Sequence, residues 1–227
     1  FYMKQRIAVI GAILSLMPLG HPLLIKTGVV LSTTGFMLSV PEKVNAETAD
    51  FYFDRAYNKA KKGDNYGAIS DYTKAIEINP SESTYYNRGI AKDELKDYYG
   101  AISDYTKAIE INPKKDSAYF NRGNAKTALK DYYGAISDYT KAIEINPNDS
   151  DFYNNRGNRK SGIKDYYGAI TDFTKAIEIN PNYALSFANR GSSKELIGDM
   201  QGACNDWRKA SSLGNENATQ WVRDQCS

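Results

Sequence analysis

Asparagine recurs at one fixed place along the chain, inside an Asn-Arg-Gly triplet. A side-chain amide carries both a hydrogen-bond donor and an acceptor, which suits it to binding a peptide main chain without a side-chain preference. Asn124 and Asn158 each follow a triplet asparagine by three residues, so on a helix they would share its face. Near the start of the series Asp54 takes the place of the amide. The triplet asparagines are Asn87, Asn121, Asn155 and Asn189.

Charged residues form two further series with the same period. A basic ladder consists of Arg88/Lys92, Arg122/Lys126, Arg156/Lys160 and Arg190/Lys194, each pair four residues apart. An acidic column consists of Asp71, Asp104, Asp138, Asp172 and Asp206. The ladder is either free to bind an acidic partner, or each arginine pairs with an aspartate of its own repeat. The equal periods and the near-neutral body of the chain favour internal pairing.

Few side chains suited to catalysis or metal binding occur in the body of the chain. The only histidine is His21, near the start, so His-based triads and His zinc sites are excluded from residues 47–227. Two isolated cysteines cannot form a zinc site, and no glycine-rich phosphate loop is present. The carboxylates repeat in register, which indicates a structural role. We therefore expect neither an enzyme nor a metal or cofactor site.

The net charge argues against nucleic acid as a ligand. The chain carries a formal charge of +2, but residues 1–46 hold four basic residues against one acidic residue, which leaves −1 for the rest. A body without basic excess lacks the electrostatic attraction on which nucleic-acid binding depends. We expect a protein or peptide partner.

Residues 1–46 resemble a signal peptide or an N-terminal membrane anchor. From Met3, the basic stretch Lys4–Arg6 precedes the apolar stretch Ile7–Leu19. From Met17, the apolar stretch is Thr27–Val40, and Val44-Asn45-Ala46 offers a cleavage site.

An uncleaved anchor is the alternative, because Ile7–Ile25 is nearly long enough to span a bilayer. Either interpretation predicts export, to the periplasm or a thylakoid lumen, and the uncleaved anchor also predicts attachment to a membrane through this segment.

A block of fourteen residues repeats along the rest of the chain. GAISDYTKAIEINP occupies Gly67–Pro80 and returns unchanged at Gly100–Pro113 and Gly134–Pro147. It returns with changes at Gly168–Pro181 and Gly202–Asn215. A fixed period of 33 or 34 residues is typical of a solenoid built from one helical unit copied in tandem.

Each unit is predicted to hold two helices, A and B. In the third unit, helix A is expected at about Ser117–Leu129 and helix B at about Tyr132–Ile145, with Lys130-Asp131 as the turn. Asn146-Pro147 ends helix B, because proline lacks a donor and disfavours helix in the residue before it. Small residues, Gly123 on A and Ala135 on B, should allow close approach to large rings such as Tyr119 and Tyr139.

These columns resemble the tetratricopeptide repeat family. The second unit supplies the family's pattern as Tyr85, Gly89, Ala101, Tyr105, Ala108 and Pro113. The resemblance covers five units, at about 49–81, 82–115, 116–149, 150–183 and 184–217. The chain departs from the family pattern at two positions of the repeat, because the arginines and lysines of the basic ladder stand where the family often has Leu and Tyr. Residues 1–46 and the Tyr-rich repeats look similar to family members from bacteria, especially photosynthetic bacteria.

The resemblance implies an all-α, right-handed superhelical solenoid whose A helices line a concave peptide-binding groove. The triplet asparagines, with Asn124 and Asn158, would face this groove and bind a ligand's main chain. Phe53, Tyr86 and Phe120 would supply apolar contacts. An alternative is that the asparagines only pair between neighbouring helices. The family's clamp for C-terminal carboxylates is not expected, because its lysine positions hold Ser83, Ser117 and Asp151.

The last residues are predicted to cap the array. The segment Glu216–Gln225 is expected to form a capping helix. The five repeats end at residue 217, so residues 218–227 are assigned to this cap. Cys204 and Cys226 lie about equally far from a turn at Gly214–Glu216, which brings their sulfurs level on antiparallel helices. In an exported protein this favours a disulfide over two unrelated buried thiols.

The sequence thus predicts a non-catalytic interaction scaffold that binds a peptide segment of a partner protein. Two alternatives remain: a membrane-anchored assembly factor for a larger complex, for example a photosynthetic one, and a self-associating structural repeat protein. Neither the partner nor the oligomeric state follows from the residues.

Overall fold

The computed structural model describes residues 27–31, 37–41 and 48–226. The chain divides into two units, residues 1–46 and 47–227. Within the first, β1 (Thr27–Leu31) pairs antiparallel with β2 (Met37–Pro41), a hairpin that the sequence analysis did not predict. The apolar stretch Ile7–Ile25 lies outside the described residues, and no helix among those described is long and apolar enough to cross a membrane.

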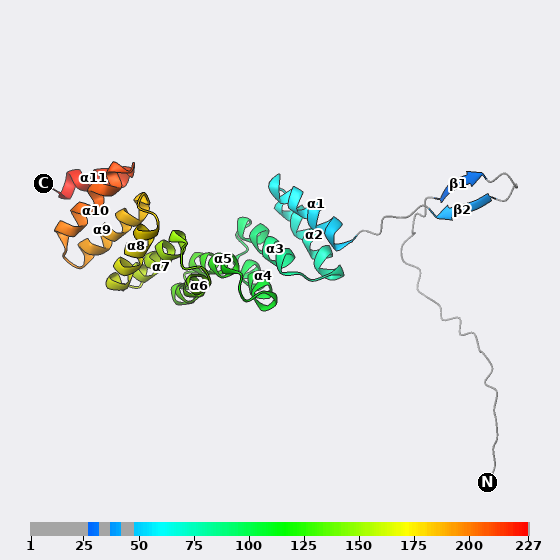
Figure 1. Cartoon of the computed structure of the whole chain (residues 1–227), viewed down its shortest axis with the longest axis horizontal. Coiled ribbons are helices and arrows are strands. Elements are labelled where there is room, and N and C mark those ends of the chain that lie inside the picture. Colours follow the sequence, from blue (N-terminus) through cyan, green and yellow to red (C-terminus); the bar gives the residue numbers. More distant parts are fainter. Residues whose placement is uncertain (1–26, 32–36, 42–47, 227) are drawn as a thin grey trace, which may run out of the picture. The chain divides into compact units, whose positions relative to one another are not determined.

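The described part of the second unit is entirely helical, as the sequence predicted. Five helical pairs follow one another, and a single short helix ends the series (Figure 1). The helices are α1 (Ala49–Lys61), α2 (Asn65–Ile78), α3 (Glu82–Glu94), α4 (Tyr98–Ile111), α5 (Asp116–Ala128), α6 (Tyr132–Ile145), α7 (Ser150–Gly162), α8 (Tyr166–Ile179), α9 (Ala184–Leu196), α10 (Met200–Ser212) and α11 (Glu216–Gln225). In the third repeat these bounds agree with the predicted helices to within one residue.

The helix starts and ends are set by short-range contacts. Each B helix begins after an aspartate whose carboxylate accepts a hydrogen bond from the third helical residue, as Asp131 Oδ1 does from Gly134 N at 3.0 Å. This third residue is a glycine because a Cβ there would overlap the capping carboxylate. At the other end Asn146 is extended, as expected for a residue before proline.

The turn between A and B needs a left-handed residue. Gly63 and Gly198 fill it in the first and fifth repeats, with φ of 81° and 86°. The three middle repeats place a lysine there instead, such as Lys130 with φ of 64°. The array therefore accepts a modest backbone strain at three equivalent turns.

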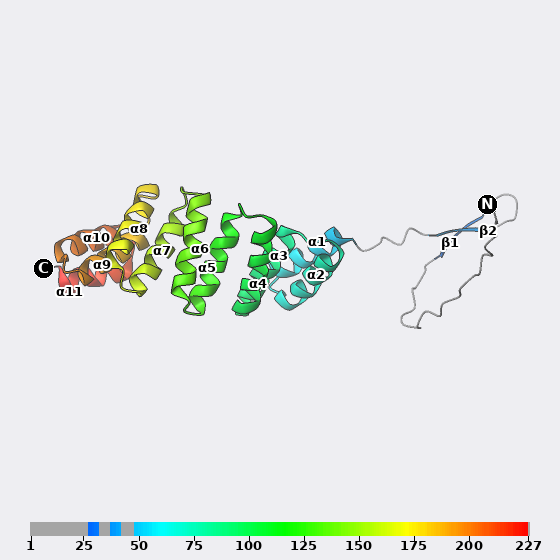
Figure 2. The same cartoon turned by 90° about the horizontal axis from the view of Figure 1, so that it is seen from below.

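The repeats stack in sequence order to form a solenoid, visible from two directions in Figures 1 and 2. Each helix packs against its neighbours along the chain. The A helices of successive repeats also touch one another, α1 with α3, α3 with α5, and α7 with α9. The A helices therefore lie on the inner side of the curve, where the sequence analysis placed the groove.

The core of each repeat is a ring on helix B packed against a small residue on helix A. Tyr139 is 1% exposed, and a Cβ on Gly123 would lie 2.7 Å from its ring. The same close approach joins Gly89 to Tyr105, Gly157 to Phe173 and Gly191 to Trp207. The alternation of small and large residues read from the sequence is thus the packing rule of the array.

The ring on helix A is buried in the first, fourth and fifth repeats, at Tyr52, Tyr153 and Phe187, but it is less buried than expected in the second and third. Tyr85 and Tyr119 are only half-buried. The guanidinium of Arg122 lies 5.5 Å from the ring centre of Tyr119, and Arg88 lies 5.6 Å from Tyr85. Each of these two rings makes a cation–π contact with an arginine, and both also pack against the buried cluster of Ala108, Ile109 and Ala118.

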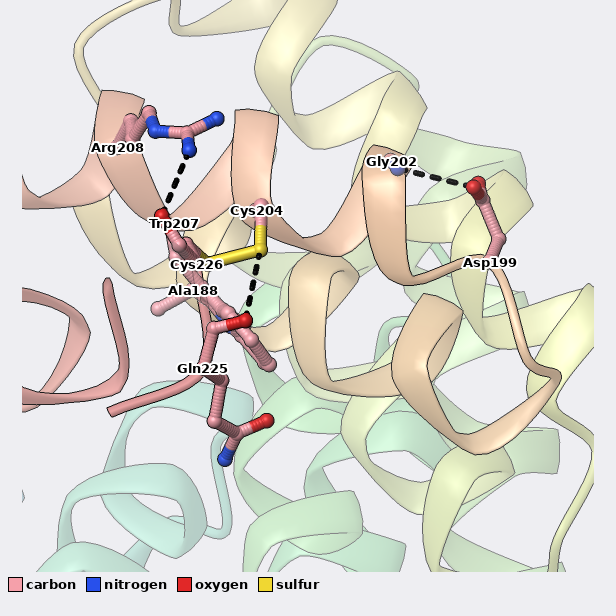
Figure 3. The surroundings of a disulfide bond; sticks show 8 residues. All are labelled: Ala188, Asp199, Gly202, Cys204, Trp207, Arg208, Gln225 and Cys226. Carbon is pink, nitrogen blue, oxygen red and sulfur yellow. Dashed lines mark hydrogen bonds between the residues drawn. A yellow bond between two sulfur atoms is a disulfide. The ribbon is translucent and has the colours of Figure 1, made fainter. Parts of the chain in front are cut away.

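Helix α11 closes the array. Its Trp221 packs on Trp207 of α10, with ring centres 5.5 Å apart. The structure joins Cys204 of α10 to Cys226, the residue after α11, in a disulfide (Figure 3). Arg208 Nη2 donates to the Cys226 carbonyl at 3.0 Å beside this bond. The chain connection and the disulfide therefore hold the helix at both ends.

We expect Gly123→Ala to destabilise the array, because its Cβ would meet the Tyr139 ring at 2.7 Å. Overpacking of this kind costs about 1–3 kcal/mol. The matched control is Gly162→Ala, at the end of α7 with no atom within 4 Å of the added Cβ. Chemical denaturation should show a loss for the first variant and no loss for the second. Equal midpoints would contradict this packing.

Loss of the disulfide should loosen α11 first. We expect Cys226→Ser to lower the free energy of unfolding by about 3 kcal/mol, the scale for a loop of this size. Intact-mass measurement of the unreduced protein should show both thiols oxidised, and hydrogen exchange of the variant should rise in α11 before the other helices. Two free thiols in the wild type would refute the bond.

Candidate functional site

A buried carboxylate sits between helices A and B of every repeat. Asp138 is 3% exposed, and Arg122 binds it with two parallel hydrogen bonds, from Nε at 2.9 Å and from Nη2 at 2.7 Å. Lys126 Nζ lies 2.7 Å from the same carboxylate. Equivalent clusters are Arg55/Lys59/Asp71, Arg88/Lys92/Asp104, Arg156/Lys160/Asp172 and Arg190/Lys194/Asp206.

The arginine of each cluster from the second repeat onward also reaches the preceding repeat. Arg122 Nη1 donates a hydrogen bond to Thr106 Oγ1 at 3.0 Å, and Thr106 Oγ1 in turn donates to the Ile102 carbonyl oxygen. The contact recurs from Arg88 to Thr73, from Arg156 to Thr140 and from Arg190 to Thr174. One guanidinium thereby ties a repeat to itself and to its neighbour.

The internal pairing that the sequence favoured for the basic ladder is confirmed by these contacts. The ladder's cations are bound to aspartates and do not form an open stripe for an acidic partner. In the first cluster, the hydrogen bond from Arg55 and the nearby Lys59 lower the pKa of Asp71 to about 2, even though burial acts in the opposite direction.

The triplet asparagines lie half-buried on helix A in two different arrangements. Asn87 and Asn155 each donate Nδ2 to a carbonyl of their own helix four residues earlier, at 2.8 Å. Asn121 donates instead to Tyr86 Oη at 3.0 Å, and Asn189 donates to Asn154 Oδ1 at 3.3 Å. The alternative of pairing between neighbouring helices therefore holds at two of the four positions. At all four the amide oxygen has no described partner, so it can accept from a ligand.

Asn124 and Asn158 occupy equivalent places but differ in their partners. Asn124 Oδ1 accepts from Tyr139 Oη at 2.7 Å. In the next repeat Phe173 replaces that tyrosine and has no hydroxyl, so no described residue bonds Asn158. Asn124 keeps its amide hydrogens for a ligand, and Asn158 keeps both donor and acceptor.

The predicted aromatic residues of the groove, Phe53, Tyr86 and Phe120, are all half-buried. Each packs on the buried ring of its own helix B, as Phe120 does on Tyr139 with centres 5.7 Å apart. Phe120 also lies 5.0 Å from Phe152 of the following repeat. These rings give the inner face apolar contact area in the first three repeats.

A pocket near these residues lies between the first two repeats. It has a volume of about 460 Å³, and its lining includes Asn87, Ile90 and Glu94 of α3 with Tyr57 and Lys61 of α1. Of these only Asn87 was predicted as a site residue. Ile90 stands three residues after Asn87, as Asn124 does after Asn121, so the same helical spacing could have found it.

Two smaller pockets contain other predicted residues. One, of about 370 Å³, is lined by Asp93, Glu94, Lys96, Tyr98 and Asn124. The other, of about 200 Å³, includes Phe53 and Asp50. Predicted site residues from the first three repeats therefore border three shallow pockets. Among the described residues no group of His, Cys, Asp and Glu is placed to hold a metal ion.

Comparison with protein families gives matches over most of the helical unit. Two family models, both described as tetratricopeptide repeat, match this chain. One matches residues 83–115 and 117–149, and the other matches residues 49–82 and 150–183. No curated protein sequence matches the chain.

Several solved structures share the fold. A MamA protein superposes with a TM-score of 0.71 at 25% identity, over 76% of this chain and 95% of that one. MamA from Desulfovibrio magneticus RS-1 superposes with a TM-score of 0.69 at 20% identity, over 73% of this chain and 94% of that one. YrrB is described as a TPR protein with an unusual peptide-binding site. It superposes with a TM-score of 0.70 at 20% identity, over 79% of this chain and 94% of that one.

The buried carboxylate of the first repeat should make stability depend on pH. The folded pKa of Asp71 is about 2 and the unfolded value is near 3.9, so the unfolded chain binds more protons between these values. The stabilisation is present above about pH 4 and is lost as the pH falls through about 2. We expect Asp71→Asn to lower the melting temperature at pH 7 and to lose this acid dependence.

The control for that experiment is Glu77→Gln, because Glu77 is exposed on α2. Melting temperatures measured from pH 2 to pH 7 should keep the wild-type profile in the control. A profile for Asp71→Asn as steep as that of the wild type would contradict the assignment.

Proposed function

Because the chain belongs to the tetratricopeptide repeat family, we propose that it binds a peptide segment of a partner protein in the groove lined by its A helices. The family's members are protein–protein interaction scaffolds and are typically non-catalytic. Stacked repeats offer a long continuous surface, which fits an extended or helical segment better than a small substrate.

The observation that carries this proposal is the set of unsatisfied amide atoms along one face. The oxygens of Asn87, Asn121, Asn155 and Asn189 accept no described hydrogen bond. An extended peptide presents N–H and C=O groups along its length, so amides at each repeat can bind it without reading its side chains. The apolar contacts come from Phe53, Tyr86 and Phe120 beside them.

Residues 1–46 extend the proposal to the protein's location. Their basic and apolar pattern supports export, with or without retention at a membrane. A membrane-held helper for the assembly of a larger complex differs from a free scaffold only in keeping this segment, so the N-terminal sequence of the purified protein decides between them.

We expect Asn121→Ala combined with Asn155→Ala to weaken peptide binding about tenfold, because two hydrogen bonds of about 0.5–1.5 kcal/mol each are lost. The measurement is a pull-down with the full chain as bait, followed by titration of the captured partner.

The matched control is Asn58→Ala combined with Asn205→Ala, since both asparagines are exposed on helices and line none of the pockets described above. The control should capture the same partners as the wild type. If the groove variant also keeps every partner at unchanged affinity, the groove proposal is wrong.

A further inference from the structure

The pocket between the first two repeats is apolar at its base. Tyr72, Ala60 and Ala91 line it with Tyr57 and Ile90. Tyr57 is 42% exposed and Ile90 is half-buried, so both side chains have surface left to cover. The volume of about 460 Å³ exceeds that of any single side chain, and an apolar residue entering it would remove this surface from water.

Two adjacent carboxylates line the smaller pocket beside this one, and neither forms an ion pair among the described residues. Asp93 and Glu94 end helix α3, and Glu94 lines both this pocket and the smaller one beside it. No ion pair or hydrogen bond to either side chain is found among the described residues. Burial, and then the charge of Glu94, raises the pKa of Asp93, as expected for a carboxylate that lacks a compensating charge.

This adjacent pair of carboxylates occurs only in the second repeat, although the fifth repeat has Glu195 at the place of Asp93. The equivalent places hold Thr127 and Ala128 in the third repeat and Ser161 and Gly162 in the fourth. Because the other repeats keep the fold without this pair of charges, packing does not require Asp93 and Glu94. They are free to serve recognition.

The other charges near the two pockets leave an acidic excess. Lys61 lines the larger pocket, with its Nζ 4.7 Å from the ring centre of Tyr57, and Lys96 lines the smaller one. Asp50 borders the next pocket, and Asp54 stands in the asparagine column. The basic residues of the two buried clusters are bound to Asp71 in the first repeat and to Asp104 in the second. Lys115 lies 5.0 Å from the ring centre of Tyr86 and pairs with Glu82 at 3.4 Å, so five carboxylates stand against three ammonium groups along this part of the groove.

We propose that the groove of the first two repeats selects a basic and apolar peptide segment. A large apolar side chain fills the pocket between α1 and α3, and a lysine or arginine close to it in sequence pairs with Asp93 and Glu94. This inference rests on the proposed function, since it assigns a peptide class to the same groove.

Selection of peptides from a random library tests the preference directly, because the library contains both basic and acidic peptides. The probe is a phage-displayed library of twelve-residue peptides, panned on the immobilised full chain. We expect the enriched peptides to carry Lys or Arg within a few residues of a large apolar side chain. One enriched peptide is then synthesised with a fluorescent label and titrated by anisotropy.

The variant for the titration is Asp93→Asn combined with Glu94→Gln, which removes charge and no described contact. Its control is Glu77→Gln combined with Glu216→Gln, which removes the same charge from two exposed residues outside the pockets. We expect the first variant to bind about fivefold more weakly and to lose most of the salt dependence, as for two partly exposed ion pairs. The control should bind within about twofold of the wild type.

The outcomes distinguish a failure of this inference from a failure of the proposed function on which it rests. Enriched peptides without basic residues, or equal affinity of the two variants, would overturn the basic preference while groove binding stands. Weaker binding to Asn121→Ala combined with Asn155→Ala would show that such peptides still occupy the groove. If no peptide is enriched at all, both the preference and the proposed function fail.

Discussion

The stack of repeats depends on one buried carboxylate per repeat. Asp138 is almost fully enclosed, and a buried charge is tolerated only when it is paired and hydrogen-bonded. Arg122 and Lys126 supply the pairing from helix A, and Arg122 continues to Thr106 of the preceding repeat. Because removing one partner of a buried pair costs about 3–5 kcal/mol, the cluster constrains both the helical hairpin and the register between repeats.

This constraint also shapes the functional surface. The cations of the ladder are held against aspartates, so they do not give the inner face a positive potential. What the inner face offers instead are the amides of the triplet column, the half-buried rings and a few carboxylates that belong to single repeats. The repeated residues therefore maintain the fold, and positions that break the repeat, such as Asp93 and Glu94, carry the potential for selectivity.

Sequence reasoning worked where the cause was local or repeated. The proline stops and the close approach of small residues such as Gly123 to rings such as Tyr139 follow from residue type and spacing. It was less successful for Tyr85 and Tyr119, which were expected to be buried and are only half-buried at the edge of the core, each beside an arginine. It also missed the hairpin of β1 and β2, because an apolar stretch alone does not distinguish a strand from part of a leader.

The sequence by itself determined the helical period and the order of the helices and favoured the pairing of each ladder arginine with an aspartate, because every copy repeats the same local rules. Only the tertiary structure decided which asparagine atoms stay free. Asn121 reaches Tyr86 of the preceding repeat, whereas Asn87 bonds its own helix, and identical triplets cannot show this difference. The pocket of Tyr57, Ile90 and Glu94 likewise exists only because stacking brings two A helices together.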